Sequence, residues 1–381
     1  MFKNNYPNIL AAVILILILL FSLISVSAAQ VSEGGICVSA KSAALYQPDT
    51  GRFAFTKNSK RRMPMASTTK IMTALVAIEN ISSLDEAVEV DESSIGTEGS
   101  SAYLKSGDVV TVEELLYALL LQSANDAAVA LAVHIGGSVD AFADMMNERA
   151  EKMGLSDTHF ANPHGLDADG HYTTAEDLAK IAAEAIDNET IYSIVSTYKK
   201  TLINDERRRT YVNHNKLLNL YDGAIGVKTG FTDEAGRCLV GAAERDGVRL
   251  ISVTLDAPSD WQDHEKMLDF GFDRFVGVTL AEVYEYGYDI PLIDKEGETL
   301  RVTNTDELSI VYEGDVGKIE KNVNLPRFIS SPVKKGDIIG TVSFTVCGRD
   351  VGSVNLCAVE DSIVIVEQKN IFKRIFDKLF S

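Results

Sequence analysis

The order of strands and helices in the N-terminal part of the chain constrains the fold more than any other feature. Residues 36–46 alternate loosely between apolar and polar side chains, which predicts a strand, and a second strand at 52–57 follows the turn "PDTG". Strands return only at 223–232, 236–246 and 248–257. Because such a sheet is completed by segments distant in sequence, we expect a mixed α/β fold (α+β in arrangement).

The segments between these strands carry helical periodicity. Residues 67–81 and 138–155 have apolar side chains at helical spacing, and residues 110–135 hold one or two strongly apolar helices. A last helix at 264–275 is expected to pack back onto the sheet. We therefore predict a first domain over residues 30–276.

The pattern changes at about residue 277. Helical periodicity disappears, and short β-rich segments such as "LRVTN", "LSIVYEG" and "IIGTVSFTV" follow one another between turn-forming residues. We therefore predict a small all-β domain over residues 277–366, with no internal repeat.

The N-terminus has the parts of a secretory signal peptide, predicted to span residues 1–29. Lys3 gives a basic start, residues 9–24 form an apolar run broken only by Ser22, and residues 27–29 are small enough for a cleavage site. The alternative is an uncleaved membrane anchor, because the run is almost long enough to span a bilayer. In both cases we expect an exported protein, at the outer face of the cytoplasmic membrane or in the cell-wall space.

The C-terminal segment 367–381 is amphipathic. On a helix that turns about 100° per residue, its apolar side chains fill one half of the circumference and its charged side chains the other half. The apolar half consists of Ile371, Phe372, Ile375, Phe376, Leu379 and Phe380. Several phenylalanines beside basic residues favour a helix that lies on a membrane surface, and a helix docked on the β domain is the alternative.

Composition excludes several partners. The formal net charge of −19 argues against a nucleic acid, since phosphate binding needs clustered Lys and Arg. No CxxC, HExxH or similar spacing is present, so we expect no metal and no cofactor. The 4 cysteines form no small-domain disulfide framework, and we expect buried free thiols. Nothing in the sequence demands more than a monomer.

Lys70 is the most unusual residue of the predicted helix at 67–81. It lies in the otherwise apolar or small stretch "MASTTKIMTAL", one helical turn after Ser67, so the two side chains share a face of the helix. A serine hydroxyl needs a nearby base to act as a nucleophile, and burial lowers the pKa of a lysine enough for it to be that base. The Ser67 N–H at the helix start could face a developing oxyanion. Alone, this S-x-x-K spacing is a weak signal.

Two further polar motifs interrupt apolar segments. Ser123 and Asn125 divide a strongly apolar run, where polar side chains need partners. They could relay a proton and bind a substrate, or they could mark an ordinary helix boundary. Lys228, Thr229 and Gly230 end an apolar strand. They could bind a carboxylate and let a ligand approach the strand edge, or they could form an ordinary strand end.

The motifs S-x-x-K, S-x-N and K-T-G follow one another in the order found in penicillin-binding proteins and class A β-lactamases. With "NPHGLDADGHYTTAEDLA", "GVKTGFTDEAG" and the export signal, the chain resembles the low-molecular-mass penicillin-binding proteins, the D-alanyl-D-alanine carboxypeptidases of serine peptidase family S11. The likeness covers nearly the whole chain. It implies a β-lactamase/transpeptidase-like catalytic domain, with a five-stranded antiparallel sheet and a helical part, and a β-sandwich-like C-terminal domain.

The resemblance also implies the catalytic residues. The substrate would be the peptidoglycan stem peptide ending in D-Ala-D-Ala. Ser67 would be the acylated nucleophile, Lys70 its general base, and Ser123 the group that passes a proton to the leaving D-alanine. Penicillin and other β-lactams would acylate the same serine.

The substrate-binding residues implied by the resemblance lie in the second and third motifs. Asn125 would bind the stem-peptide backbone, and Lys228 and Thr229 would hold the terminal carboxylate. Gly230 would let the peptide approach the strand edge. The backbone N–H of Phe231 would complete the oxyanion hole with that of the nucleophile.

The chain departs from the family pattern at two places. Some relatives carry histidine in place of Phe231, of which only the backbone is used here. Some also carry an arginine before the helix that contains "MLDFGF", where it helps to bind the carboxylate. This chain reads "APSDWQDHEK" there, without an arginine, so carboxylate binding falls more heavily on Lys228 and Thr229 and Trp261 has no assigned role.

Three other functions stay open at this point. A class A β-lactamase would need a glutamate in E-x-x-L-N, and the nearest match, "EAIDN" at Glu184, lacks the leucine. A D,D-endopeptidase acting on cross-links would use the same catalytic set, although the long C-terminal domain favours a carboxypeptidase. A β-lactam sensor or scaffold that acylates and stalls would also keep the motifs.

Overall fold

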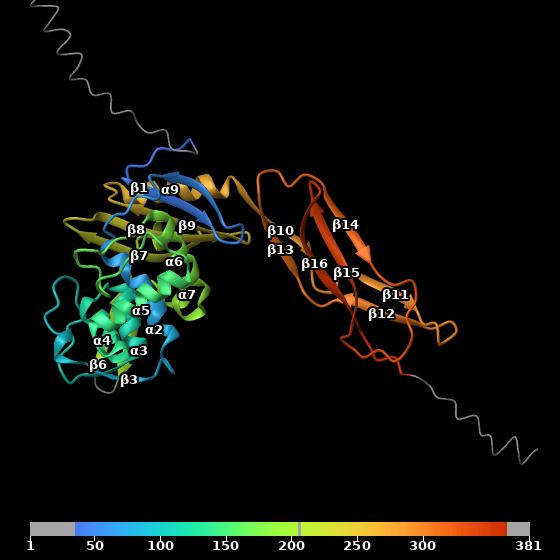
Figure 1. The fold of residues 1–381 in the computed structure, drawn as a ribbon, viewed down its shortest axis with the longest axis horizontal. Coiled ribbons are helices and arrows are strands. Elements are labelled where there is room, and N and C mark those ends of the chain that lie inside the picture. Colours follow the sequence, from blue (N-terminus) through green and yellow to red (C-terminus); the bar gives the residue numbers. More distant parts are fainter. Residues whose placement is uncertain (1–34, 205–206, 364–381) are drawn as a thin grey trace, which may run out of the picture.

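The computed structural model describes residues 35–204 and 207–363 of the chain. These residues form an α/β part and a β-rich part, and the β-rich part extends from one end of the α/β part (Figure 1). The predicted signal peptide and the predicted amphipathic tail lie outside the described residues.

A five-stranded sheet forms the centre of the α/β part, in the order β2-β1-β9-β8-β7, and every neighbouring pair is antiparallel. Its strands are β1 (Ser42–Gln47), β2 (Arg52–Lys57), β7 (Ala224–Thr232), β8 (Gly236–Arg245) and β9 (Val248–Leu255). Ser42 pairs with Leu255, so the first strand lies beside the last. This confirms a mixed α/β fold whose sheet is completed from both ends, and it leaves β7 as an open edge.

Helices cover both faces of this sheet. The larger group packs on one face and consists of the 3₁₀ turn η1 (Ala66–Thr69), α2 (Lys70–Glu79), α3 (Val112–Leu121), α4 (Asn125–Gly136), α5 (Val139–Lys152), α6 (Ala175–Asp187) and α7 (Glu189–Val195). Helix α9 (Asp260–Phe272) covers the other face. The remaining short elements are β3 (Ala87–Glu89), η2 (Glu92–Ser94), β4 (Val109–Thr111), β5 (Lys199–Asn204), β6 (Arg207–Val212) and α8 (Leu217–Leu220).

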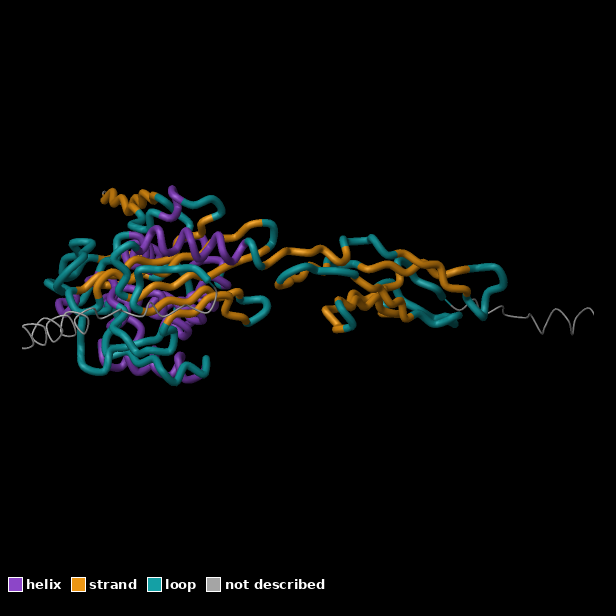
Figure 2. The backbone as a smooth tube through the Cα atoms, turned by 90° about the horizontal axis from the view of Figure 1, so that it is seen from above, coloured by secondary structure: helices purple, strands orange, loops and turns teal. Residues whose placement is uncertain are grey.

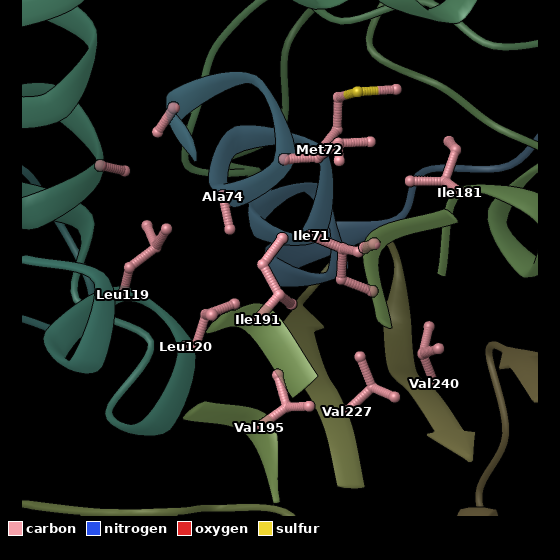
Figure 3. Packing of buried hydrophobic residues seen from close by; sticks show 14 of the residues in the cluster. Ile71, Met72, Ala74, Leu119, Leu120, Ile181, Ile191, Val195, Val227 and Val240 are labelled. Carbon is pink, nitrogen blue, oxygen red and sulfur yellow. The ribbon is translucent and has the colours of Figure 1, made fainter. Parts of the chain in front are cut away.

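The larger core surrounds α2. Figure 3 shows Ile71 and Ala74 of this helix gathered with Leu119 and Leu120 of α3 and with side chains of the sheet such as Val227. Burying one aliphatic side chain of this size contributes roughly 1.5–3 kcal/mol relative to exposing it. The packing of α2 therefore fixes the position of the S-x-x-K motif at its start.

Strand β10 (Phe275–Ala281) joins the two parts without a loop. Phe275 lies in the core beneath α9, whereas Leu280 lies in the core of the β-rich part. β10 also pairs with β13 (Leu308–Glu313). The position at which the composition changes therefore falls inside a strand, not in a flexible linker.

The β-rich part is built on a second five-stranded sheet, in the order β11-β12-β16-β15-β14, together with the pair β10-β13. Its strands are β11 (Gly287–Pro291), β12 (Thr299–Asn304), β14 (Ile319–Asn324), β15 (Ile338–Val346) and β16 (Arg349–Ala358). Figure 2 shows strands and loops throughout this part of the chain. The prediction of a small all-β C-terminal domain is confirmed.

The expectation of buried thiols is wrong for most of the cysteines. Cys238 is buried on β8, but Cys37 and Cys347 are exposed and Cys357 is half-buried, and all of these thiols are free. Cys37 precedes β1 instead of lying in a strand, and Cys347 lies in the turn between β15 and β16. Segments before a strand and turns between strands run over the protein surface, which accounts for the exposure of both thiols.

No single helix among residues 35–204 and 207–363 is long and apolar enough to cross a membrane. Helices α4 and α5 together have the length and apolar composition of a membrane span, but a bend of 83° separates them. Both helices contribute buried side chains, such as Leu131 and Phe142, to the larger core.

Candidate active site

Ser67 lies in η1, directly before α2. The preceding Ala66 has φ 49°, a left-handed conformation that is uncommon for a residue with a Cβ. Thr69 Oγ1 donates a hydrogen bond to the Ala66 carbonyl over 2.8 Å. Gly165 lies so close to the same oxygen that a Cβ built on it would be 2.0 Å away. Neither η1 nor α2 has a side-chain cap. The contacts of Thr69 and Gly165 with Ala66 therefore hold the backbone around Ser67.

His171 supports the same turn in a defined tautomer. The Ala161 N–H donates to His171 Nδ1 over 3.0 Å, so the proton of the neutral ring lies on Nε2, which donates to Thr69 Oγ1 over 2.8 Å. Burial is the main cause that lowers the pKa of His171 to about 4, and the ring is therefore neutral at neutral pH. Hydrogen bonds thus run continuously from Ala161 through His171 and Thr69 to the Ala66 carbonyl.

Lys70 is the central group of the site. Its side chain is fully buried, and Nζ lies 2.9 Å from Ser67 Oγ, 2.6 Å from Asn125 Oδ1 and 2.5 Å from the His164 carbonyl oxygen. Burial, and then the charge of Lys228, lowers the pKa of Lys70 well below 10.5. The sequence-based expectation of a lysine beside the serine in an apolar helix wall is met by this geometry.

The three contacts of Lys70 satisfy an ammonium, which donates to all three oxygens, and they also suit a neutral amine. A neutral amine has two N–H donors and one lone pair. The Asn125 Oδ1 and the His164 carbonyl can only accept, so they take the two N–H groups. The lone pair is then left for Ser67 Oγ, whose hydroxyl proton can point at Nζ. This is the arrangement of a nucleophile and its general base.

The second motif lies at the break between α3 and α4. Ser123 has φ 63° and lines the cleft described below, whereas Asn125 opens α4. The Asn125 side chain is only 3% exposed, because its Oδ1 accepts from Lys70 and its Nδ2 donates to the Glu98 carbonyl. In this arrangement Asn125 holds the lysine in place and does not face the open cleft.

Loop 162–166 supplies groups to the site that residue types alone did not predict. Asn162 closes the loop, because its Oδ1 accepts from the Gly165 N–H over 2.7 Å and its Nδ2 donates to the Leu166 carbonyl over 2.9 Å. The loop thereby directs the His164 carbonyl at the lysine and places Gly165 against the turn of the serine. The sequence signal for this loop is the run Asn-Pro-His-Gly, whose backbone groups contact the residues of the site.

The third motif lies within β7 and not at its end, because the strand continues to Thr232. Lys228 is 1% exposed and its Nζ donates to the Thr229 carbonyl over 2.8 Å. Burial lowers the pKa of Lys228 to about 7. The ammonium group that was expected to hold a carboxylate therefore lies behind the edge strand.

Gly230 is required by the protein's own packing. A Cβ built on it would be 3.0 Å from the Ser67 backbone nitrogen and 3.1 Å from the Ala66 Cβ. The missing side chain lets β7 approach η1 closely. The edge strand and the serine thus form adjacent walls of one site.

A cleft of about 430 Å³ opens between these walls. It is lined by Ser67, Ser100, Ser123, His214, Lys216, Thr229, Gly230, Phe231, Arg237, Cys238, Asp260 and Trp261. Most of the predicted site residues line this cleft, and Lys70, Asn125 and Lys228 lie behind its walls. Arg237 and Asp260 belong to none of the three sequence motifs. Among the described residues, no group of three or more His, Cys, Asp or Glu side chains is arranged to hold a metal.

Glu184, the residue considered for a class A β-lactamase, lies outside the cleft. It is on α6, its side chain is 49% exposed, and it pairs with Arg149 over 2.6 Å. The cleft lining contains no glutamate. Glu184 is therefore not placed to activate a deacylating water.

Two family models match the chain. Residues 27–259 match D-alanyl-D-alanine carboxypeptidase, and residues 281–362 match the C-terminal domain of penicillin-binding protein 5. Among curated proteins, the chain is 33% identical over 332 residues to D-alanyl-D-alanine carboxypeptidase DacF of Bacillus subtilis, covering 84% of this chain and 85% of the relative. It is 32% identical to DacA of Escherichia coli, with 89% and 87% covered.

Solved structures give the same picture. Penicillin-binding protein 5 from Haemophilus influenzae superposes with a TM-score of 0.62 at 28% identity, covering 86% of this chain and 99% of that one. The Streptomyces K15 DD-transpeptidase superposes with a TM-score of 0.60 at 36% identity, covering 62% of this chain and 98% of that one. The second match is limited to a part of this chain, as expected for a relative that is shorter.

Proposed function

The chain belongs to the D-alanyl-D-alanine carboxypeptidase family of serine peptidases, and from this premise we propose the role of each residue in the site. The activity is hydrolysis of the last peptide bond of a peptide that ends in D-Ala-D-Ala. The comparisons support this activity and none of the three alternatives. The observation that carries the assignment of residues is the 2.9 Å contact between Ser67 Oγ and the buried Lys70 Nζ.

Acylation begins when Ser67 Oγ attacks the carbonyl carbon of the penultimate D-alanine. Lys70 takes the hydroxyl proton as the Oγ–C bond forms, and the N–H groups of Ser67 and Phe231 stabilise the oxyanion. When the C–N bond breaks, Ser123 donates a proton to the nitrogen of the leaving D-alanine and regains one from the Lys70 ammonium. The products of this step are free D-alanine and an ester on Ser67.

Deacylation consumes one water molecule. The water adds to the ester carbonyl as its proton passes to Lys70, and Lys70 returns that proton to Ser67 Oγ as the C–Oγ bond breaks. The released peptide is shorter by one D-alanine. A β-lactam presents its strained ring amide at the same position, so Ser67 opens the ring and the leaving nitrogen stays tethered to the acyl group.

The edge strand β7 would receive the peptide as an added strand, with Gly230 and Phe231 at the point of closest approach. Thr229 lines the cleft, and its hydroxyl is the group of this motif that reaches the terminal carboxylate. Lys228 acts from behind the strand, where it holds the Thr229 carbonyl. Asn125 serves mainly by holding Lys70.

The first test is release of free D-alanine from diacetyl-Lys-D-Ala-D-Ala by the mature protein, with Ser67→Ala beside it. We expect release by the wild type and a loss of roughly 10⁴-fold or more in the variant, because the nucleophile is absent. Wild-type enzyme treated with penicillin should gain the mass of the drug on the peptide that contains Ser67. Equal release by both proteins would overturn the assignment of Ser67.

We also propose that the reaction takes place on peptidoglycan stem peptides outside the cytoplasm. The support is the signal-like segment 1–29 and the amphipathic segment 367–381, which would tether the mature protein to the membrane surface. Deleting residues 370–381 should move the mature protein into the soluble fraction. Retention on membranes, with cleavage of the signal confirmed by N-terminal sequencing, would contradict the tether.

A further inference from the structure

Arg237 lies in the cleft although no motif points to it. It is near the start of β8 and pairs directly with Phe231 across the β7–β8 hairpin. Side chains of directly opposed residues in an antiparallel pair lie on the same face of the sheet. Arg237 therefore stands beside Phe231 and lines the cleft together with Thr229 and Ser67. Its side chain is 48% exposed, so it is open to a ligand.

Asp260 holds the guanidinium of Arg237 in a fixed orientation. Arg237 Nε lies 3.1 Å from Asp260 Oδ2, and Nη2 lies 3.0 Å from Oδ1 and 2.9 Å from Oδ2. The Asp260 side chain is only 6% exposed, and its Oδ1 also accepts from the Trp261 N–H over 3.0 Å. This fork-to-carboxylate contact uses Nε and Nη2. Among the described residues, Nη1 is left without a hydrogen-bond partner.

The two buried lysines of the site are poorly placed to receive a carboxylate. Lys70 is engaged by Ser67, Asn125 and His164. Lys228 is buried behind β7, and burial lowers its pKa to about 7, so it is not a permanent charge at neutral pH. An arginine stays protonated in every protein environment and presents a planar set of donors that matches a carboxylate.

We propose that Arg237 receives the terminal carboxylate of the substrate, with Thr229 as its hydrogen-bonding partner and Asp260 as the residue that positions the guanidinium. This proposal rests on the proposed function and adds the group that selects peptides with a free C-terminus. The arginine comes from β8 and lines the same cleft as Thr229 of the edge strand. Lys216, an exposed lysine on the same cleft, is the rival receiver.

The test compares two substrates that differ only at the group in question. One is diacetyl-Lys-D-Ala-D-Ala, and the other is the same peptide ending in D-alaninamide, which has no negative charge. Wild type should prefer the acid. Arg237→Gln should lower kcat/KM for the acid by about 10- to 100-fold, mainly through KM, and change kcat/KM for the amide by less than about threefold. The ratio of the two values does not depend on how much of the variant is folded.

Three further variants sharpen the test. Arg237→Lys keeps the charge but not the fork, and it should retain part of the preference for the acid. Asp260→Asn should also reduce the preference, with less effect than Arg237→Gln, because the guanidinium keeps its charge but loses its anchor. Arg245→Gln, at the far end of β8, is the matched control for charge and strand packing and should leave the acid-to-amide ratio unchanged.

The outcomes separate this proposal from the proposed function. If wild type releases neither D-alanine nor D-alaninamide and is not acylated by penicillin, the proposed function is wrong and this proposal falls with it. If wild type releases D-alanine but Arg237→Gln lowers acid and amide equally, Arg237 has a structural role and the proposal alone is wrong. The same holds if Lys216→Gln, and not Arg237→Gln, removes the preference.

Discussion

The two walls of the cleft differ in how completely their polar groups are paired. On the helical wall, Lys70 is fully buried and Asn125 is 3% exposed, and Lys70 Nζ contacts Ser67, Asn125 and His164. On the strand wall, Phe231 is 63% exposed and the Arg237 side chain is 48% exposed. The helical wall is complete without a ligand, whereas the strand wall has donors that remain to be used.

This difference follows from the two tasks of the site. A lysine acts as a base only if its pKa is lowered, and burial provides that lowering. A carboxylate receiver needs access and a lasting charge, which burial would remove. Lys228 illustrates the conflict, because its burial on the strand wall lowers its pKa to about 7. Burial thus suits Lys70 to proton transfer. The same burial makes Lys228 unsuited to a direct ion pair with a carboxylate.

Lys70→Arg should produce the largest effect on the helical wall. An arginine keeps a positive charge in place but cannot give up its proton, so we expect acylation to slow by about 10²- to 10⁴-fold. The measurement is the rate at which penicillin adds its mass to the protein. A variant that acylates within tenfold of the wild type would show that charge, and not proton transfer, is what Lys70 supplies.

Gly165→Ala should test whether the turn at Ser67 is held by the loop. The new Cβ would stand 2.0 Å from the Ala66 oxygen, at φ +89°, so unfolding should become easier by at least about 2 kcal/mol and acylation should fail. Gly170→Ala is the matched control. It has a similar φ of +79° but meets only His159 at 3.7 Å, and should cost only about 1–2 kcal/mol with acylation retained. Equal effects would rule out the clash as the cause.

Thr69→Val should have a smaller effect on the same wall. It leaves the Ala66 carbonyl and His171 Nε2 without their shared partner, so we expect a loss of about 1–3 kcal/mol in stability and a lower kcat at nearly unchanged KM. Thr68→Val removes a hydrogen bond of the same kind, to Met65, without touching Ala66. If both variants lower kcat to the same extent, the connection through His171 has no catalytic importance.

Glu184→Gln should have the smallest effect. The residue lies on the surface beside Arg149, and an exposed ion pair contributes only about 0–1 kcal/mol. Hydrolysis of the penicillin acyl-enzyme should change by less than about twofold. A large slowing of this step would revive the β-lactamase interpretation and move part of the chemistry away from the cleft walls.

The sequence was sufficient for the parts that rest on local pattern. Loose alternation at residues 36–46 and the return of strands over residues 223–257 predicted the sheet, and the spacing of Ser67 and Lys70 predicted their contact. The family resemblance supplied the remaining motif residues. These parts depend on neighbours in the chain or on motifs with a fixed order.

The missed parts depend on contacts between distant segments. The His164 carbonyl meets Lys70 across 94 positions, and a backbone oxygen leaves no trace in residue type. Asp260 reaches Arg237 across 23 positions, and no motif of the sequence links these two residues. Asn125 was expected to face the substrate, because the sequence does not reveal that Lys70 and Glu98 occupy its amide.

The most direct test of the account is the pKa of Lys70 itself. Protein labelled with [ε-¹³C]lysine should show one resonance, absent from Lys70→Arg, that titrates well below 10.5. The penicillin acylation rate of the wild type should fall about tenfold per pH unit below that same pKa, because protonation removes the lone pair that accepts the Ser67 proton. A Lys70 resonance that titrates near 10.5, with no matching change in acylation, would contradict the assignment of Lys70 as the neutral base.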